Sequence, residues 1–400
     1  MFAKPKLPCK GRAMRVLVVH NAYQHKGGED TVMEAEVALL RSRGHTVEMF
    51  TRHNDAIASM SKLSAAVNTV WSGNVAAEFE GTLRAFQPDV VHVHNTFPLI
   101  SPAIYWVAAR LQVPVLQTLH NFRLMCPQAM LLRNGKVCED CLGKLPWRGA
   151  ARGCYRGSVL QSTVLAGMVT VHRAMGTWQN KVTRYIALNE FCRGKFIEGG
   201  LPAERIAIKP NFVDFQPPAP AERQGFLFVG RLSSEKGVDV LVNAQRQVKG
   251  SALRVAGTGP DASLLDKVPG LNAMGALQME QVRQEMGAAI ALVLPSIWYE
   301  NFPRTLVEAL GCGLPVIASR IGALAELVKD GETGLLFEPG NAEDLAHKMR
   351  WALANPQAMA AMGRNARKQY EAEFTAERNY QQLMTIYESA IAEVKDRISA

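Results

Sequence analysis

The stretch of residues 294–322 constrains the fold more than any other part of the sequence. It reads LPSIWYENFPRTLVEALGCGLPVIASRIG. Apolar runs predict one strand over 290–294 and another over 315–318. Between them, Asn301 as N-cap and Pro303 in the first turn predict a short helix, which two glycines end. Strand, loop, helix and strand in this order are typical of an α/β fold built on a parallel sheet.

Two carboxylates flank the start of this predicted helix. Glu300 lies just before it, and Glu308 lies about two turns on, with a side chain that leans back toward the N-terminus. The free backbone amides of the first turn are a ready seat for phosphate. An anion seat between two carboxylates suits a nucleotide-sugar, whose diphosphate binds amides and whose hydroxyls bind carboxylates. The alternative is that both glutamates belong to a solvated helix face.

Cations follow another predicted strand, over 226–230. Arg231 and Lys236 come after it, and a helix is predicted over 238–248. Cations at the carboxyl end of a strand can neutralise a diphosphate leaving group. The alternative is a pair of surface charges beside a turn.

The first half of the chain opens with a strand, a Gly27-Gly28 loop, a helix over 30–42 and a further strand. This is a βαβ pattern, but G-x-G-x-x-G is absent, so the loop is not a dinucleotide fingerprint. It brings backbone close to a ligand, or it is a plain turn.

Three histidines lie on or directly after predicted strands. His120 ends the strand over 113–119, at the edge where α/β sheets bind ligands, and this favours a functional role. His92 and His94 lie within a strand over 90–94 and are expected to be structural.

These motifs resemble those of the retaining glycosyltransferases of family 4. The resemblance rests on E-x7-E within Pro-Ser…Glu-x-Phe…Glu-Ala…Gly-x-Pro-Val-Ile-Ala-Ser, on G-R-L…K-G, on the strand-end histidine and on the Gly-Gly loop. It implies the α/β GT-B architecture, with two Rossmann-like domains facing an interdomain cleft. The expected acceptor-side domain is 14–215, with a C-terminal helix over 382–400 packed back on it, and the expected nucleotide-sugar-binding domain is 216–381.

The resemblance also implies roles for individual residues. It assigns the diphosphate to Arg231, Lys236 and the amides near Thr305 and Leu306, the ribose to Glu308, the transferred sugar to Glu300, and the acceptor side of that sugar to His120. The full expected set is catalytic Glu300, His120, Arg231 and Lys236, and donor-binding Gly28, Gly230, Arg231, Lys236, Gly257, Asn301, Phe302, Thr305, Leu306 and Glu308. No metal or other cofactor is expected, because side-chain cations take the place of a metal.

One residue departs from the family pattern. Where many relatives have Gly-Phe-Gly, this chain has Asn-Phe-Pro, ending in Pro303. Proline has no N–H, so one backbone contact to the sugar or phosphate is lost.

The implied function is retaining transfer of a hexose-type sugar from a UDP-, GDP- or ADP-linked donor to a glycan or lipid-linked acceptor in cell-surface polysaccharide synthesis. The alternatives are a sugar-nucleotide epimerase of the same fold, and a non-catalytic protein that binds nucleotide-sugars.

Charge and hydropathy limit the partners. The 400 residues carry a net charge of +9 and a pI of about 9.2, but no recognisable nucleic-acid module. The positive charge suits an anionic membrane surface, or it serves solubility alone.

The sequence contains no uninterrupted apolar run of 18 residues, so no membrane span is predicted. Residues 1–13 are basic without the apolar core of a signal peptide and are expected to be a disordered extension. We therefore expect a cytoplasmic protein, with the inner membrane face as a candidate peripheral site.

Four of the seven cysteines fall close together as C-x11-C-x2-C-x12-C: Cys126, Cys138, Cys141 and Cys154. One C-x-x-C with two further thiols is compatible with a structural zinc site. Because the spacing is irregular, reduced and partly buried thiols are the other reading. A related cysteine-rich insert is common in this branch of family 4, which places it on the acceptor side.

Two further segments organise the chain. Residues 157–182 predict one largely apolar helix that becomes basic and aromatic toward its end, and that packs on the sheet or lies on a bilayer surface. Three prolines within 217–220 predict an extended linker between the two halves.

Overall fold

A computed structural model describes residues 12–24, 27–214, 218–219 and 222–399. Most of the expected extension over 1–13 and part of the expected linker lie outside these residues. The chain divides into two compact units. One holds the chain up to Gln117, Asn180–Arg184 and the chain from Tyr387 on, and the other holds Thr118–Gln179 and Tyr185–Ile386. Each unit is described by itself below.

The first unit is built on parallel strands in the order β2-β1-β3-β4. The centre of β1 is buried on both sides, as expected of a parallel strand covered by helices. Its elements are β1 (Arg15–Ala22), α1 (Gly28–Ser42), β2 (Thr46–His53), a 3₁₀ turn (Asn54–Ser59), α2 (Lys62–Val70), α3 (Gly73–Phe86), β3 (Val90–Asn95), α4 (Ala103–Arg110) and β4 (Val115–Thr118), and it also contains the last turns of α15 (Ala376–Ser399).

The second unit holds a six-stranded sheet in the order β11-β10-β9-β12-β13-β14, with parallel pairing throughout. Before this sheet come β5 (Leu132–Arg133), β6 (Lys136–Val137), α5 (Trp147–Ala151), α6 (Val159–Ala174), α7 (Thr177–Asn180), β7 (Arg184–Ala187), α8 (Glu190–Glu198) and β8 (Ile206–Ile208). The sheet and its helices are β9 (Phe226–Val229), α9 (Val238–Gln245), β10 (Leu253–Ala256), β11 (Leu271–Gly275), α10 (Met279–Gly287), β12 (Ala291–Leu294), α11 (Arg304–Gly311), β13 (Val316–Ser319), α12 (Gly322–Leu327), β14 (Gly334–Phe337), α13 (Ala342–Ala354) and α14 (Pro356–Glu373).

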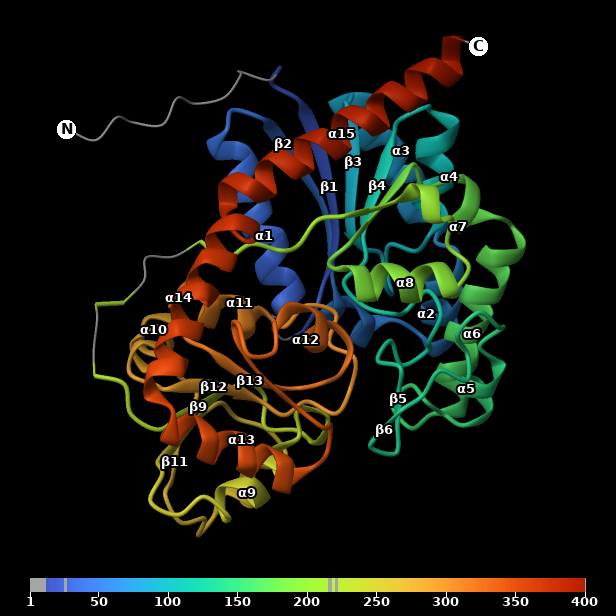
Figure 1. The fold of residues 1–400 in the computed structure, drawn as a ribbon. Coiled ribbons are helices and arrows are strands. Elements are labelled where there is room, and N and C mark those ends of the chain that lie inside the picture. The colour runs from blue at the N-terminus through green and yellow to red at the C-terminus, as the bar shows by residue number, and fades with distance from the viewer. Residues whose placement is uncertain (1–11, 25–26, 215–217, 220–221, 400) are drawn as a thin grey trace, which may run out of the picture. The chain divides into compact units, whose positions relative to one another are not determined.

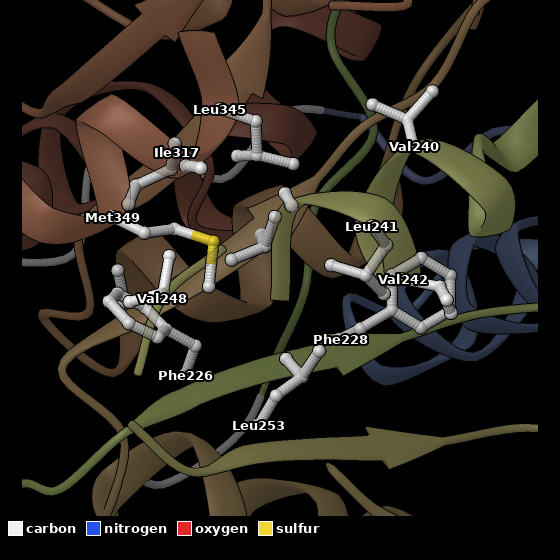
Figure 2. Close-up of a cluster of buried hydrophobic side chains, with 14 of the residues drawn as sticks. Phe226, Phe228, Val240, Leu241, Val242, Val248, Leu253, Ile317, Leu345 and Met349 are labelled. Carbon is white, nitrogen blue, oxygen red and sulfur yellow. The ribbon is translucent and has the colours of Figure 1, made fainter. Parts of the chain in front are cut away.

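Alternate residues of this sheet face two separate cores, because side chains of a strand point to opposite faces in turn. Phe226 and Phe228 of β9 face the core under α9 and α13, whereas Leu227 faces the core under α11 and α14. Figure 1 shows α9 and α13 on one side of the sheet and α11 and α12 on the other. Figure 2 shows the first core, where Ile317 and Met349 meet the β9 side chains. The sheet is therefore buried on both faces, and its loops are the accessible part.

Two sequence-based predictions of helices were wrong. The single helix expected over 157–182 is two helices, because the chain turns at Gly176, whose φ of +68° is a left-handed conformation that glycine adopts without strain. The short helix expected to begin near Asn301 or Phe302 begins at Arg304, with Pro303 as its N-cap. Asn301 is therefore a loop residue.

In the described part of the chain, every helix is too short or too polar to cross a lipid bilayer.

Candidate functional site

The order of the second sheet reverses between β9 and β12. From β9 the chain continues to β10 on one side, whereas β12 lies on the other side. At such a switch point the loops after the two strands part, and α/β proteins bind ligands in the space between them. The loops in question are 230–237 after β9 and 295–303 after β12. They contain half of the residues that the sequence selects: Gly230, Arg231, Lys236, Glu300, Asn301 and Phe302.

The two loops are in backbone contact. Gly237 has a φ of +69°, and an ideal Cβ placed on it would lie 2.0 Å from the carbonyl oxygen of Pro295. Only glycine allows both this conformation and this approach. Beside it, the amide of Ile297 donates to the carbonyl of Glu235 at 3.0 Å. The loops therefore form one structural unit that fixes the side chains they carry.

Lys236 and Glu300 come together at this contact. The ammonium of Lys236 lies 2.9 Å from Oε2 of Glu300, and the hydroxyl of Ser296 donates to Oε1. Glu300 is only 6% exposed. Both carboxylate oxygens thus have a charged or polar donor, which holds a buried carboxylate in one orientation.

Other donors of the two loops point to no protein acceptor. Within the described residues, exposed Arg231 has no side-chain hydrogen bond or ion pair. The buried atoms Trp298 Nε1 and Asn301 Nδ2 also lack a hydrogen-bond partner there. Since buried donors are nearly always paired, such atoms indicate a place where a ligand supplies the acceptors. A free guanidinium and two unpaired N–H groups on these two loops suit an anionic, oxygen-rich ligand.

Helix α11 adds backbone donors. The amide of Leu306 donates to the carbonyl of Pro303 at 2.9 Å, so it is not free for a ligand. The amides of Arg304 and Thr305, the first two residues of the helix, have no intrahelical acceptor. The backbone amides that this helix leaves free for an anion are therefore those of Arg304 and Thr305, one residue earlier in the chain than expected.

Glu308 faces the interior one turn further along α11. It is 4% exposed, and Nε of Arg304 lies 2.8 Å from its Oε1. Burial raises the pKa of Glu308, and the positive charge of Arg304 opposes that effect. A buried carboxylate with a raised pKa is typical of a functional position.

Gly230 and Gly257, the remaining glycines of the expected set, allow two stretches of backbone to lie in contact. An ideal Cβ on Gly257 would lie 1.8 Å from the carbonyl oxygen of Gly230, so the turns after β9 and β10 touch through their backbones. No larger residue fits at Gly257.

Three further candidates are placed differently from the group around Glu300. His120 is half-buried at the carboxyl end of β4. The ring of Phe302 packs against Phe374, at 6.2 Å between centroids, so its side chain belongs to the core. Gly28 is the first residue of α1 in the other unit, and a Cβ on it would have no neighbour within 4 Å.

Sequence reasoning missed a set of polar contacts around α8. Asn189 caps α8 and its Nδ2 donates to the carbonyl of Asn301 at 2.6 Å. The carboxylate of Glu326, on α12, accepts from the amides of Glu190 at 2.9 Å and Phe191 at 2.7 Å. These bonds fix the loop after Glu300 from a second direction. An N-cap asparagine directly after a predicted strand was a usable signal for Asn189.

His92 and His94 form a buried group with Glu36 whose donor atoms lie close enough to hold a metal ion. Nδ1 of His92 lies 3.0 Å from the Glu36 carboxylate and 2.8 Å from the hydroxyl of Tyr387. Burial lowers the pKa of His94 to about 4. These distances are those of a hydrogen-bond network that joins α1, β3 and the last turns of α15.

Comparisons with known proteins agree with this geometry. Residues 27–211 match the model of the glycosyl transferase 4-like domain, and residues 211–369 match that of the glycosyl transferases group 1. The chain is 30% identical over 296 residues to a sulfoquinovosyl transferase of Arabidopsis thaliana, covering 72% of this chain and 54% of that protein. It spans about half the length of the first curated relatives it matches.

Solved structures with the same fold include sucrose-phosphate synthase of Thermosynechococcus elongatus, with a TM-score of 0.70 at 20% identity, covering 95% of this chain and all of that one. Another is Anabaena HepE in complex with UDP-glucose, with a TM-score of 0.62 at 18% identity, covering 96% of this chain and all of that one. The expected fold class, α/β with two Rossmann-like, parallel-sheet domains of the GT-B type, is confirmed.

Proposed function

Because the chain combines a glycosyl transferase 4-like domain with a domain of the glycosyl transferases group 1, we propose that it is a retaining glycosyltransferase. It moves a hexose-type sugar from a nucleotide-sugar to a hydroxyl of a glycan or lipid-linked acceptor. The observation that carries the proposal is the contact of Lys236 with Glu300 at the switch point, in the two loops that also carry the unpaired side chain of Arg231.

The diphosphate of the donor binds to cations and helix amides. Arg231 and Lys236 supply the charge, and the amides of Arg304 and Thr305 supply hydrogen bonds. Without a ligand, Lys236 is neutralised by Glu300. A diphosphate that takes over the ammonium frees one carboxylate oxygen of Glu300 to accept from a sugar hydroxyl.

The sugars bind to the carboxylates. Glu308 holds the ribose hydroxyls, Glu300 holds the transferred sugar, and Asn301 and Trp298 offer further N–H donors near it. His120 lines the acceptor side of that sugar. Gly230 and Gly257 let the turns after β9 and β10 touch through their backbones, and in our proposal the nucleotide binds beside these turns.

The chemical step retains the configuration of the anomeric carbon. The bond from that carbon to the diphosphate oxygen breaks, and a bond to the acceptor oxygen forms on the same face. The acceptor proton passes to the leaving diphosphate, so the products are the glycoside and a nucleoside diphosphate. Arg231, Lys236 and the helix amides stabilise the charge that develops on the leaving group.

The experiment is incubation of the full chain with radiolabelled UDP-, GDP- and ADP-sugars. Slow hydrolysis of one donor with release of the α-anomer supports the transferase. Isomerisation of the nucleotide-sugar supports an epimerase, and binding without turnover supports a non-catalytic protein. Glu300→Ala should abolish turnover, and Arg231→Ala should lower it at least about 10²-fold; wild-type activity in either variant contradicts the assignment.

The acceptor that we propose belongs to cell-surface polysaccharide synthesis, at an anionic membrane surface. Helix α2 supports this, because Leu63, Val67 and Trp71 are all exposed along one side of it, next to Lys62. Leu63→Asp with Val67→Asp should abolish co-sedimentation with vesicles that contain phosphatidylglycerol. Equal sedimentation of variant and wild type would contradict membrane binding through α2.

A further inference from the structure

The cysteine-rich segment 126–158 has little regular structure to stabilise it. It contains two strands of two residues each and a helix of five residues. Positive φ angles recur along it, at Ala129, Leu131, Asn134, Gly135, Gly143, Gly153, Arg156 and Gly157. A short, irregular segment of this kind buries too little apolar surface to hold one conformation unaided, and proteins stabilise such segments with disulfides or metal ions.

All four cysteines of the segment border one narrow cavity. Cys126 precedes the β5–β6 hairpin, Cys138 directly follows it, Cys141 lies one turn further, and Cys154 returns from the far end. The amide of Cys138 donates to the carbonyl of Leu131 at 2.8 Å, which fixes the base of the hairpin. The chain thus brings together thiols that lie up to 28 positions apart.

Residues around the cavity suit a cluster of thiolates. A Cβ on Gly149 would lie 3.6 Å from Sγ of Cys141 and 2.9 Å from Cγ of Pro127, so glycine allows the backbone to pass close to the sulfur. Arg133 and Arg152 border the same cavity.

The thiols are free in the structure, with no disulfide among the described cysteines. Several thiols that border one cavity without forming disulfides are the donor set that soft divalent metals select.

We propose that Cys126, Cys138, Cys141 and Cys154 bind one Zn²⁺ ion as a structural site. One C-x-x-C pair from a hairpin base and two further thiols make a tetrahedral set of four sulfurs. No three of these sulfurs lie within 4.8 Å of one another, so the ion draws them inward as it binds. Two positive charges on the ion and four thiolates leave a net charge of −2, and Arg133 borders the cavity together with Arg152, which pairs with Asp140.

The site lies beside the residues proposed to bind the donor. Glu139, between Cys138 and Cys141, pairs with Lys195 at 2.7 Å. The hydroxyl of Tyr299 also hydrogen-bonds to the Glu139 carboxylate, and Tyr299 is the residue before Glu300. An ion that fixes the Cys138–Cys141 turn therefore fixes a support of the catalytic loop.

The test measures metal content in the full chain, purified without chelators from zinc-supplemented cells. We expect about one zinc per chain by inductively coupled plasma mass spectrometry, and four sulfurs at about 2.3 Å by X-ray absorption. Alkylation followed by peptide mass spectrometry should label the four cysteines only after the metal is removed. Cys138→Ser and Cys141→Ser should lose the zinc, whereas Cys312→Ser, at the end of α11, should keep it.

Several outcomes would overturn the site. A wild-type protein that folds without bound metal, that holds iron, or that links these cysteines as disulfides contradicts the proposal. So does full zinc content in both Cys138→Ser and Cys141→Ser. Because Cys138 is half-exposed, its serine variant has the better chance of folding. Circular dichroism of that variant separates loss of zinc from loss of fold.

Discussion

At the scale of single residues, Glu300 is oriented before any ligand arrives. Lys236 and Ser296 hold its two oxygens, while Arg231 stays unpaired among the described residues. The two cations thus have different tasks, although the sequence suggests one. In the proposed mechanism, Lys236 positions Glu300 and contributes charge, and Arg231 contributes charge alone.

Because the two residues have different contacts, we expect their alanine variants to have different kinetic defects. Arg231→Ala should lower kcat about 10²- to 10³-fold, as expected when one charged donor to a leaving group is removed. Lys236→Ala should lower kcat at least as much and should also weaken sugar binding, because Glu300 loses its partner. Steady-state kinetics with the preferred donor measure both. Arg246→Ala, on the surface of α9, is the matched control and should retain activity.

Glu308 predicts a pH effect on stability. Its raised pKa means that the folded protein binds this proton more tightly than the unfolded chain does. The resulting stability is fully present below the ordinary pKa of 4.5 and is lost as the pH rises through the raised value. Glu308→Gln does not titrate, so its Tm relative to wild type should increase from pH 4.5 upward and then level off.

Thermal unfolding between pH 4 and 8 checks this expectation, with exposed Glu371→Gln as control. A Tm difference between Glu308→Gln and wild type that stays constant over the whole range would contradict the burial of a carboxylate there. Nucleotide affinity should fall in the same variant, because the neutral amide is a weaker acceptor for the ribose hydroxyls.

At the scale of elements, the site depends on loops that touch through glycine. Gly237 brings the loop after β9 against Pro295, in the loop after β12. Without that approach, Lys236 and Glu300 would not meet. The element boundaries matter as well, because a helix that begins at Arg304 offers the amides of Arg304 and Thr305.

Gly237→Ala should therefore separate the two loops. Gly250→Ala is the matched control, since Gly250 also has a positive φ of +76° but no atom within 4 Å of its Cβ position. The control should cost about 1–2 kcal/mol of stability from backbone strain alone. Gly237→Ala should cost more and should also lower kcat. Equal losses of stability in the two variants, with full activity in Gly237→Ala, would contradict the loop contact.

Much of this could be predicted from sequence, for physical reasons. Strand ends of one parallel sheet meet at one edge, so Lys236 and Glu300 could be expected to lie together. The periodicity of apolar residues does not reveal which backbone amide already has a hydrogen-bond acceptor. The hydrogen bond from the Leu306 amide to the Pro303 carbonyl was therefore missed. Nor does periodicity locate a turn inside an apolar run, so the break at Gly176 was missed.

Some site contacts are not specified by a sequence pattern, although Ser296 is the serine of the Pro-Ser motif. Ser296 and Trp298 contribute through the direction of one polar atom, which depends on side-chain packing. The convergence of the four cysteines on one cavity depends on the hairpin and turns between them, and an irregular spacing cannot specify these. Such residues become visible only when the three-dimensional arrangement is known.

At the scale of the whole molecule, the two domain matches together run from residue 27 to 369. The donor residues other than Gly28 all belong to the compact unit that holds the second sheet. In the proposed assignment, donor recognition is thus a property of that unit, which also contains His120. This predicts that nucleoside diphosphates bind in the absence of any acceptor.

The most direct test of the account is calorimetric titration of the full chain with UDP, GDP and ADP. We expect one of the three to bind preferentially, with an affinity at least about tenfold lower in Arg231→Ala, the loss of one hydrogen-bonded charge. Binding of none of the three, or equal affinity in wild type and Arg231→Ala, would contradict the claim that the loops after β9 and β12 hold the diphosphate of the donor.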